Sequence, residues 1–321
     1  MKEIAFGIDI GGTNTVYGLV DRNGECIAED TMPTQAYESF DEYLKNLTDK
    51  MKEMLNRFSD ISLSGIGIGA PNGNYYSGTI EYAPNLKKWW GVIKVTESIK
   101  KYFPDTFSLL TNDANAAAIG EMVYGGAKNM KNFIIITLGT GVGSGLVVNG
   151  ELVYGHDGFA GEIGHAITVP NGRDCGCGRK GCLETYASAN GIRRTVAELL
   201  ALRTHDSELR DVTFNNLTAK LITDAALRGD KIALESYQIT GDILGKQLAD
   251  TVAHTSPEAY FLFGGLANAG ELIFKPTYES MERNLLNVFK NKVKLLPSRV
   301  PESNAAVLGA SALVWKELAK R

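Results

Sequence analysis

The chain has 321 residues, of which 44% are hydrophobic and 22% are charged, and its formal net charge is −4. This composition is typical of a globular protein large enough for two lobes, and it offers no basic stripe for binding nucleic acid. No apolar run approaches the roughly 20 residues that span a bilayer, and the N-terminus lacks signal-peptide features. We therefore expect a cytoplasmic protein with no nucleic-acid or membrane partner.

The first segment predicts a β-hairpin with a glycine-rich tip. Residues 4–9 and 16–20 are strand candidates on either side of the turn at 10–13, and Asn23-Gly24 follows. Asn-Gly supplies the positive φ angles of a type I′ turn. The pattern further along predicts a helix at 40–57, a strand beginning at 65, a loop at 71–91, a helix at 92–102, a strand at 107–110 and a helix at 115–124.

Residues 133–150 repeat the plan of the first hairpin. A strand at 133–137, a glycine loop at 138–145 and a strand at 146–148 lead to Asn149-Gly150. Helices are predicted at 185–202, 217–228, 233–254 and 304–318, with a buried strand at 260–263 before Gly264-Gly265. The class is therefore α/β. The repeat indicates two related lobes, although coincidence is the alternative because strand–glycine–strand patterns are common.

Three of the four cysteines, Cys175, Cys177 and Cys182, lie close together, and His165 precedes them. Structural zinc sites bind four tetrahedral ligands, commonly three cysteines and one histidine, and glycines let the backbone turn tightly around the ion. We predict a structural Zn²⁺ site. Three unpaired cysteines, or one disulfide with a thiol left over, are the alternatives. Cysteines clustered in this way fit a reducing cytoplasm.

Two glycine-rich turns are candidate phosphate-binding loops. The first contains Asp9, Gly11, Gly12, Thr13 and Asn14, and the second contains Gly139, Thr140, Gly141 and Gly143. Glycines allow backbone amides to approach phosphate oxygens, and Asp9 could hold Mg²⁺ directly or through water. Neither loop fits a Walker A or dinucleotide motif, because a strand follows the glycines. Each loop alone is more often a plain hairpin turn, but together with Gly264-Gly265 they predict a nucleotide held between two lobes.

These motifs, taken in order, closely resemble the ROK family of repressors and sugar kinases over almost the whole chain. The stretch 162–184 is the most specific part and is similar to the bacterial glucokinase branch. The resemblance implies an actin-like, hexokinase-like ATPase fold, in which a ribonuclease H-like unit is duplicated. It also implies ATP, Mg²⁺ and structural Zn²⁺ as cofactors. Residues 1–115 plus about 303–321 would form the smaller lobe and 116–302 the larger one. ROK repressors carry a DNA-binding module before the first loop; only eight residues precede Asp9, which favours a kinase.

The resemblance also implies roles for individual residues. Asp113 matches the catalytic base, whereas the sequence alone equally allows a helix cap. The family's sugar contacts match Asn85, Asn112, Asp113, Glu162, His165 and Glu184; its zinc ligands match His165, Cys175, Cys177 and Cys182. Many members have a basic residue where this chain has Asn14, so backbone amides and Mg²⁺ would carry more of the phosphate contact. Trp89-Trp90 could stack on a sugar, but core packing or a subunit contact is the favoured role.

We therefore expect an ATP-dependent hexose kinase that phosphorylates the 6-hydroxyl of glucose. The alternatives are a ROK kinase for another sugar, such as N-acetylmannosamine, fructose or allose, and a sugar-sensing protein without catalysis. The choice of sugar depends on the loop geometry of residues 71–90, which the sequence leaves open. The resemblance further implies a homodimer or a dimer of dimers.

Overall fold

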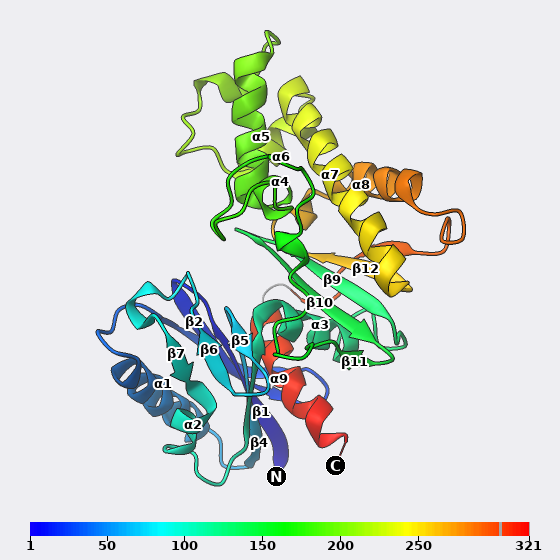
Figure 1. The fold of residues 1–321 in the computed structure, drawn as a ribbon. Coiled ribbons are helices and arrows are strands. Elements are labelled where there is room, and N and C mark those ends of the chain that lie inside the picture. Colours follow the sequence, from blue (N-terminus) through cyan, green and yellow to red (C-terminus); the bar gives the residue numbers. More distant parts are fainter. Residues whose placement is uncertain (302–303, 321) are drawn as a thin grey trace. The chain divides into compact units, whose positions relative to one another are not determined.

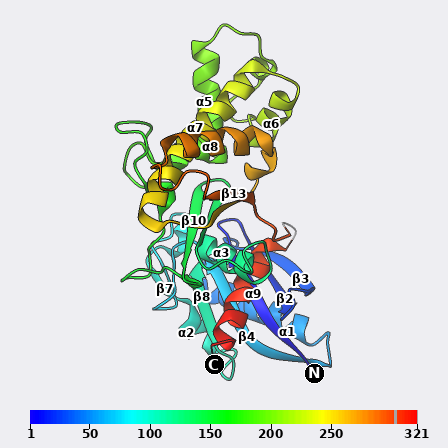
Figure 2. The same ribbon diagram turned by 90° about the vertical axis from the view of Figure 1, so that its right-hand side faces the viewer.

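The computed structural model describes residues 1–301 and 304–320, which form two compact units (Figures 1 and 2). The first unit contains Met1–Met130, Gly145–Gly161 and the described part of the chain from Arg299 onward, and the second contains Lys131–Ser144 and Glu162–Ser298. The lobe boundary expected at residue 115 falls inside helix α3 (Asp113–Val123), which belongs to the first unit. The boundary expected near residue 303 lies outside the described residues.

The first unit is built on a five-stranded sheet of order β3-β2-β1-β4-β8. β1 pairs antiparallel with β2 and parallel with β4, which in turn is parallel to β8. The strands are β1 (Lys2–Ile10), β2 (Asn14–Asp21), β3 (Cys26–Pro33), β4 (Ile61–Ala70) and β8 (Ser108–Asn112). The predicted hairpin of β1 and β2 is confirmed. At its far end only Gly24 has a positive φ, of 85°, because the Asp21 carboxylate accepts the N–H groups of Asn23 and Glu25.

Helices cover both faces of the first sheet, because side chains alternate along each strand. Ile4 and Phe6 of β1 belong to the core that packs against helix α1 (Phe40–Leu55), whereas Ala5 packs against helix α9 (Ala305–Leu318). A Cβ on Gly7 or on Gly67 would overlap a backbone carbonyl of α9. The two glycines therefore allow the helix to lie directly on β1 and β4, and both views show α9 (red) beside β1 (blue) (Figures 1 and 2).

The segment between β4 and β8 differs from the prediction. It contains a small sheet of β5 (Gly73–Asn74), β6 (Thr79–Glu81) and β7 (Val92–Lys94), the 3₁₀ helix η1 (Lys87–Trp89), and helix α2 (Val95–Lys100). The helix predicted from residue 92 begins only at Val95, because Val92–Lys94 pairs with β6. Trp89 is buried against the rings of Phe40 and Tyr43, as favoured, while Trp90 is 63% exposed.

The second sheet repeats the first, with strand order β11-β10-β9-β12-β13. As β1, β4 and β8 do, β9, β12 and β13 pair in parallel. The strands are β9 (Phe133–Leu138), β10 (Val142–Val148), β11 (Glu151–Leu152), β12 (Ala259–Phe263) and β13 (Lys294–Pro297). Asn149 and Gly150 have φ angles of 54° and 81°, as a type I′ turn requires. The predicted duplication is therefore present, and the chain leaves the second unit within β10.

The helices of the second unit follow the glycine hairpin and the cysteine segment. They are α4 (Glu184–Ala187), α5 (Ala189–Leu202), α6 (Ala219–Leu227), α7 (Lys231–Thr255) and α8 (Glu271–Asn284), with 3₁₀ turns η2 (Ile163–His165), η3 (Glu208–Asp211) and η4 (Ala267–Ala269). The single helix predicted at 185–202 was wrong: Ser188 is extended, and its Oγ caps α5 by accepting the Gly191 N–H at 2.9 Å. The sequence pattern did not predict helix α8. Among the described residues, no helix has the length and apolar character needed to cross a bilayer.

Candidate functional site

Asp9 and Asp113 come together in the first unit at the carboxyl ends of neighbouring strands. Asp9 is the next-to-last residue of β1 and pairs with Gly69 of β4, which pairs with Thr111 near the end of β8. Both acids lie next to Gly69: a Cβ built there would lie 3.3 Å from the Ala116 Cβ, 3.5 Å from Asp9 Oδ1 and 3.7 Å from the Asp113 Cα. The sheet register thus places two carboxylates at one edge.

Burial, followed by the charge of Asp113, raises the pKa of Asp9 to about 7. Burial also raises the pKa of Asp113, and the N–H of Ala114 opposes that rise by donating to its carboxylate. The Asp113 side chain nevertheless keeps solvent-exposed surface, so the group is both desolvated and reachable. Two desolvated carboxyls, one of which raises the pKa of the other, create a place where a cation stabilises the ionised form, and oxygen ligands are those that Mg²⁺ prefers.

The helix that carries Asp113 is capped by its neighbour. Asn112 is the N-cap of α3, and its side chain accepts the Ala114 N–H at 2.8 Å. Asp113 is the first helical residue, where the helix dipole favours a negative charge. The alternative of Asp113 as the cap is therefore wrong, and its carboxylate does not have to serve as the N-cap.

The first glycine turn lies against Asn85. The Gly11 N–H donates to the Asn14 carbonyl at 3.0 Å, and a Cβ on Gly12 would lie 3.1 Å from the Cβ of Asn85. The Gln35 side chain bridges the two segments by donating to the Gly12 carbonyl and to the Asn85 carbonyl. Thr13, Asn14 and Asn85 are all exposed. Gln35 joins the two predicted segments, a role that no local sequence pattern signals.

The second glycine turn is held by a carboxylate from the cysteine segment. The Val142 N–H donates to Glu184 Oε2 at 3.0 Å, and a Cβ on Gly141 would overlap the same oxygen. The start of α5 holds the other side of this turn, since the Ala189 N–H donates to the Gly139 carbonyl and the Asn190 side chain donates to the Thr140 carbonyl. Glu184 is therefore fixed against the predicted phosphate loop.

A cavity of about 610 Å³ opens beside this turn within the second unit. Gly139 and Thr140 line it together with Gly265, one of the two glycines after β12. Its opposite wall comes from α6, whose contribution the sequence analysis missed: Ala219, Lys220, Thr223, Asp224 and Leu227. The cavity is large enough for a drug-sized organic ligand. The predicted glycines at 139 and 265 thus line one cavity.

The four predicted zinc ligands also come together in the second unit. His165, Cys175, Cys177 and Cys182 place their ligand atoms within 4.8 Å of one another. The Cys175 Sγ lies 3.7 Å from His165 Nδ1, and the Sγ atoms of Cys177 and Cys182 are 3.6 Å apart. Four ligands at about 2.0–2.3 Å from a tetrahedral zinc ion would be roughly 3.5–3.8 Å apart. The cluster therefore fits Zn²⁺, and neither a disulfide nor dispersed thiols describes it.

Tight turns bring the cysteines to this geometry. The Gly178 N–H donates to the Cys175 carbonyl, and Gly178 and Gly181 have φ angles of 85° and 77°. Such angles favour glycine, because a Cβ would be strained there. On the histidine side, the His165 N–H donates to the Glu162 carbonyl within the η2 turn. Glu162 and Glu184 thus lie one turn and two residues, respectively, from zinc ligands.

Two groups of predicted site residues result. The first unit holds Asp9, the Gly11–Asn14 turn, Asn85, Asn112 and Asp113. The second unit holds the Gly139–Gly143 turn, Glu162, the metal cluster, Glu184 and Gly264-Gly265. Within each group the structure brings named members together, at Gly69, at Asn85, at Glu184 and in the 610 Å³ cavity.

The pattern of the ROK family matches residues 5–317. The chain belongs to the ROK family. It is 31% identical to the glucokinase of Thermotoga maritima over 97% of each chain. It is 28% identical to a putative xylose repressor of a Caldicellulosiruptor species, over 98% of this chain and 79% of that protein. A ROK family glucokinase from Streptomyces griseus, solved in complex with glucose and AMPPNP, matches with a TM-score of 0.81 and 28% identity, over 97% and 98% of the two chains. The α/β, two-lobed, hexokinase-like fold expected from the sequence is confirmed.

Proposed function

We propose that this ROK protein is an ATP-dependent hexose kinase that transfers the γ-phosphoryl group to the 6-hydroxyl of glucose. The observation that carries the proposal is the pair Asp9 and Asp113, which the register of β1, β4 and β8 places at one sheet edge. The likeness to the Thermotoga maritima glucokinase over 97% of the chain supports glucose as the acceptor. A kinase of this class needs one carboxylate near the acceptor hydroxyl and a second for the metal that accompanies ATP.

Asp113 is the proposed base. Phosphoryl transfer has a loose transition state, so orienting the hydroxyl matters more than early proton removal. A carboxylate with exposed surface and a raised pKa suits this role, because a base whose pKa is nearer to neutrality accepts a proton more readily. Asn112 would add an amide contact to the sugar, and Asn85 would add another from the segment beside the first glycine turn.

The second unit would contribute contacts to both the nucleotide and the sugar. The 610 Å³ cavity beside Gly139 and Gly265 would take adenosine, and the two glycine turns would bind phosphates through backbone amides. Mg²⁺, for which Asp9 is the proposed ligand, would supply neutralising charge at the phosphates. Glu162, His165 and Glu184 would contact sugar hydroxyls; His165 directs Nδ1 to the cysteines, which leaves Nε2 for the sugar.

Zn²⁺ would be structural, because His165 and three cysteines fill a tetrahedral site and leave no open position for water. It would fix the direction of Glu184 two residues after Cys182. We also expect the homodimer or dimer of dimers that the family resemblance implies, which light scattering measures directly.

A sugar-sensing protein is the second candidate, and the likeness to the xylose repressor at 28% identity favours it. Another acceptor, such as N-acetylmannosamine, fructose or allose, would keep the same kinase chemistry with a different fit around residues 71–90.

The decisive experiment is a panel of hexoses in an assay that couples ADP release to NADH oxidation, combined with calorimetric sugar binding. Glucose should give the highest kcat/KM, and the product should be glucose 6-phosphate by NMR. A higher kcat/KM for another hexose would refute glucose as the substrate but not the kinase reaction. Sugar binding without ADP release from any hexose would refute the kinase and support the sensor.

A further inference from the structure

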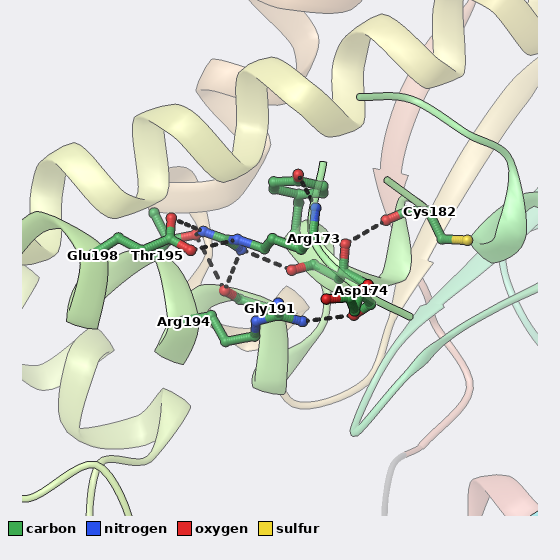
Figure 3. Close-up of polar contacts among 9 residues, drawn as sticks. Arg173, Asp174, Cys182, Gly191, Arg194, Thr195 and Glu198 are labelled. Atoms are coloured by element: carbon green, nitrogen blue, oxygen red, sulfur yellow. Dashed lines mark hydrogen bonds and ion pairs between the residues drawn. The ribbon is translucent and has the colours of Figure 1, made fainter. Parts of the chain in front are cut away.

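Arg173 connects the zinc-binding segment to the helices that follow it. It lies two residues before Cys175, yet its side chain is only 8% exposed and is directed toward α4 and α5 (Figure 3). A buried guanidinium is costly unless its charge and its donors are satisfied. The hydrogen-bond acceptors around the Arg173 guanidinium therefore show which groups hold this side chain in place.

All five N–H donors of the Arg173 guanidinium are used. Nε and Nη2 donate to the two carboxylate oxygens of Glu198 at 2.9 and 2.6 Å, forming a bidentate pair. Nη1 donates to the carbonyls of Thr185 and Gly191 at 2.7 and 3.1 Å, and Nη2 also donates to Thr195 Oγ1 at 2.9 Å. Figure 3 shows the contacts with Gly191, Thr195 and Glu198 of α5. No donor is left over for a ligand, so Arg173 does not itself bind substrate.

The backbone of Arg173 is tied to the same helices. Its N–H donates to the Tyr186 hydroxyl at 3.0 Å, and its carbonyl accepts the Gly181 N–H at 2.8 Å. Its guanidinium lies 4.4 Å from the centre of the Tyr186 ring, which adds a cation–π contact. Main chain and side chain thus fix the zinc segment on both sides of Cys182.

The groups that Arg173 holds are next to proposed site residues. Thr185 directly follows Glu184, whose carboxylate binds the Val142 N–H in the second glycine turn. Gly191 lies in the first turn of α5, and the preceding residues Ala189 and Asn190 hold the carbonyls of Gly139 and Thr140. The Arg173 guanidinium therefore links the metal cluster to Glu184, the proposed sugar ligand, and to the proposed phosphate-binding turn at Gly139–Gly141.

We propose that Arg173 is a positioning residue, which fixes Glu184 and the Gly139–Gly141 turn relative to the zinc ligands so that sugar and phosphate are held together. This inference rests on the proposed kinase function. Glu198 keeps 55% of its side chain exposed, and both of its carboxylate oxygens accept from Arg173, so it would act through Arg173. Lysine is no substitute, because its three donors lack the planar fork that reaches Glu198 and two carbonyls at once.

The test compares four variants of the full-length protein: Arg173→Met, Arg173→Lys, Glu198→Gln and Arg203→Met. Arg203 is the matched control, since it also pairs bidentately with a glutamate, Glu235, in the second unit but away from the site. Three quantities are measured for each: kcat and KM for glucose, the rate of zinc release to the chelator 4-(2-pyridylazo)resorcinol, and the Tm.

Loss of Arg173 should raise KM for glucose about tenfold and lower kcat, since misplacing a binding group by about 1 Å has effects of this size or larger. Zinc release from Arg173→Met should be about tenfold faster, as when groups supporting a metal ligand are removed. Arg173→Lys should recover only part of both, Glu198→Gln should raise KM about threefold, and Arg203→Met should leave all three unchanged.

A purely stabilising role predicts a different result. A lower Tm in Arg173→Met with KM, kcat and zinc release all within about twofold of wild type would overturn the proposal. If Arg173→Met does not fold, Glu198→Gln and Arg173→Lys decide, and wild-type KM in both overturns it. If the wild-type protein phosphorylates no hexose, the proposed function fails, and zinc release then decides the positioning role: faster release supports it, and unchanged release overturns it.

Discussion

Replacing Asp9 with asparagine should remove a pH-dependent loss of stability from the first unit. Burial and the charge of Asp113 raise the pKa of Asp9 from 3.8 to about 7 in the folded protein. The folded state therefore holds this proton more tightly, so the group stabilises the fold at low pH, and that stability is lost as the pH rises through about 7. A pKa difference of one corresponds to about 1.4 kcal/mol, so the loss between pH 5 and pH 8 is about 2.5 kcal/mol.

Urea unfolding at pH 5, 6, 7 and 8, in magnesium-free buffer of constant ionic strength, measures this loss. The unfolding free energy of Asp9→Asn minus that of wild type should grow by about 2.5 kcal/mol across the range. Asp105→Asn removes an exposed acid of the same unit, and its profile should run parallel to wild type. If the difference between Asp9→Asn and wild type stays constant with pH, the carboxyl is not desolvated as described, and the reasoning about the acidic pair is refuted.

Three further changes test other parts of the molecule. Asp113→Asn should lower kcat about 100-fold or more, as loss of a general base does, without lowering the Tm, because burial opposes a charge there; a coupled ADP assay and a thermal melt decide. Cys177→Ser removes a thiolate ligand, so zinc per chain by mass spectrometry should fall after dialysis against a chelator, and a full complement would contradict the site. Gly67→Ala places a methyl group against the Ala310 carbonyl and should cost about 1–3 kcal/mol in urea unfolding; an unchanged value would mean that α9 shifts freely.

Local patterns predicted the features that depend on neighbours in sequence. The two glycine hairpins are marked by strand-like segments and by Asn-Gly, and the metal cluster is marked by three cysteines and a histidine between residues 165 and 182. In both cases the interacting groups are close along the chain, so spacing alone constrains their geometry.

Features that depend on distant pairing were not predictable in this way. Asp9 and Asp113 meet only because β1, β4 and β8 adopt one register, which brings both acids next to Gly69. The residues of α6 that line the cavity have ordinary amphipathic spacing, which carries no sign of a ligand.

Two errors had local causes that competed with periodicity. Ser188 interrupts a continuous helical pattern because its side chain caps the next helix, and serine at an N-cap outweighs helix continuation. Residues 92–94 have side chains compatible with a helix, but pairing with β6 draws them into a strand. In both places hydrogen bonding outweighed the apolar pattern.

The close seating of α9 on Gly7 and Gly67 has a consequence for synthesis of the chain. The helix that completes this side of the first sheet is translated after the entire second unit. Until α9 is translated, the face of β1 and β4 that it covers stays exposed in the nascent first unit. All segments of the second unit are translated before that point. We expect ribosome-bound chains halted before residue 305 to recruit chaperones at β1 and β4.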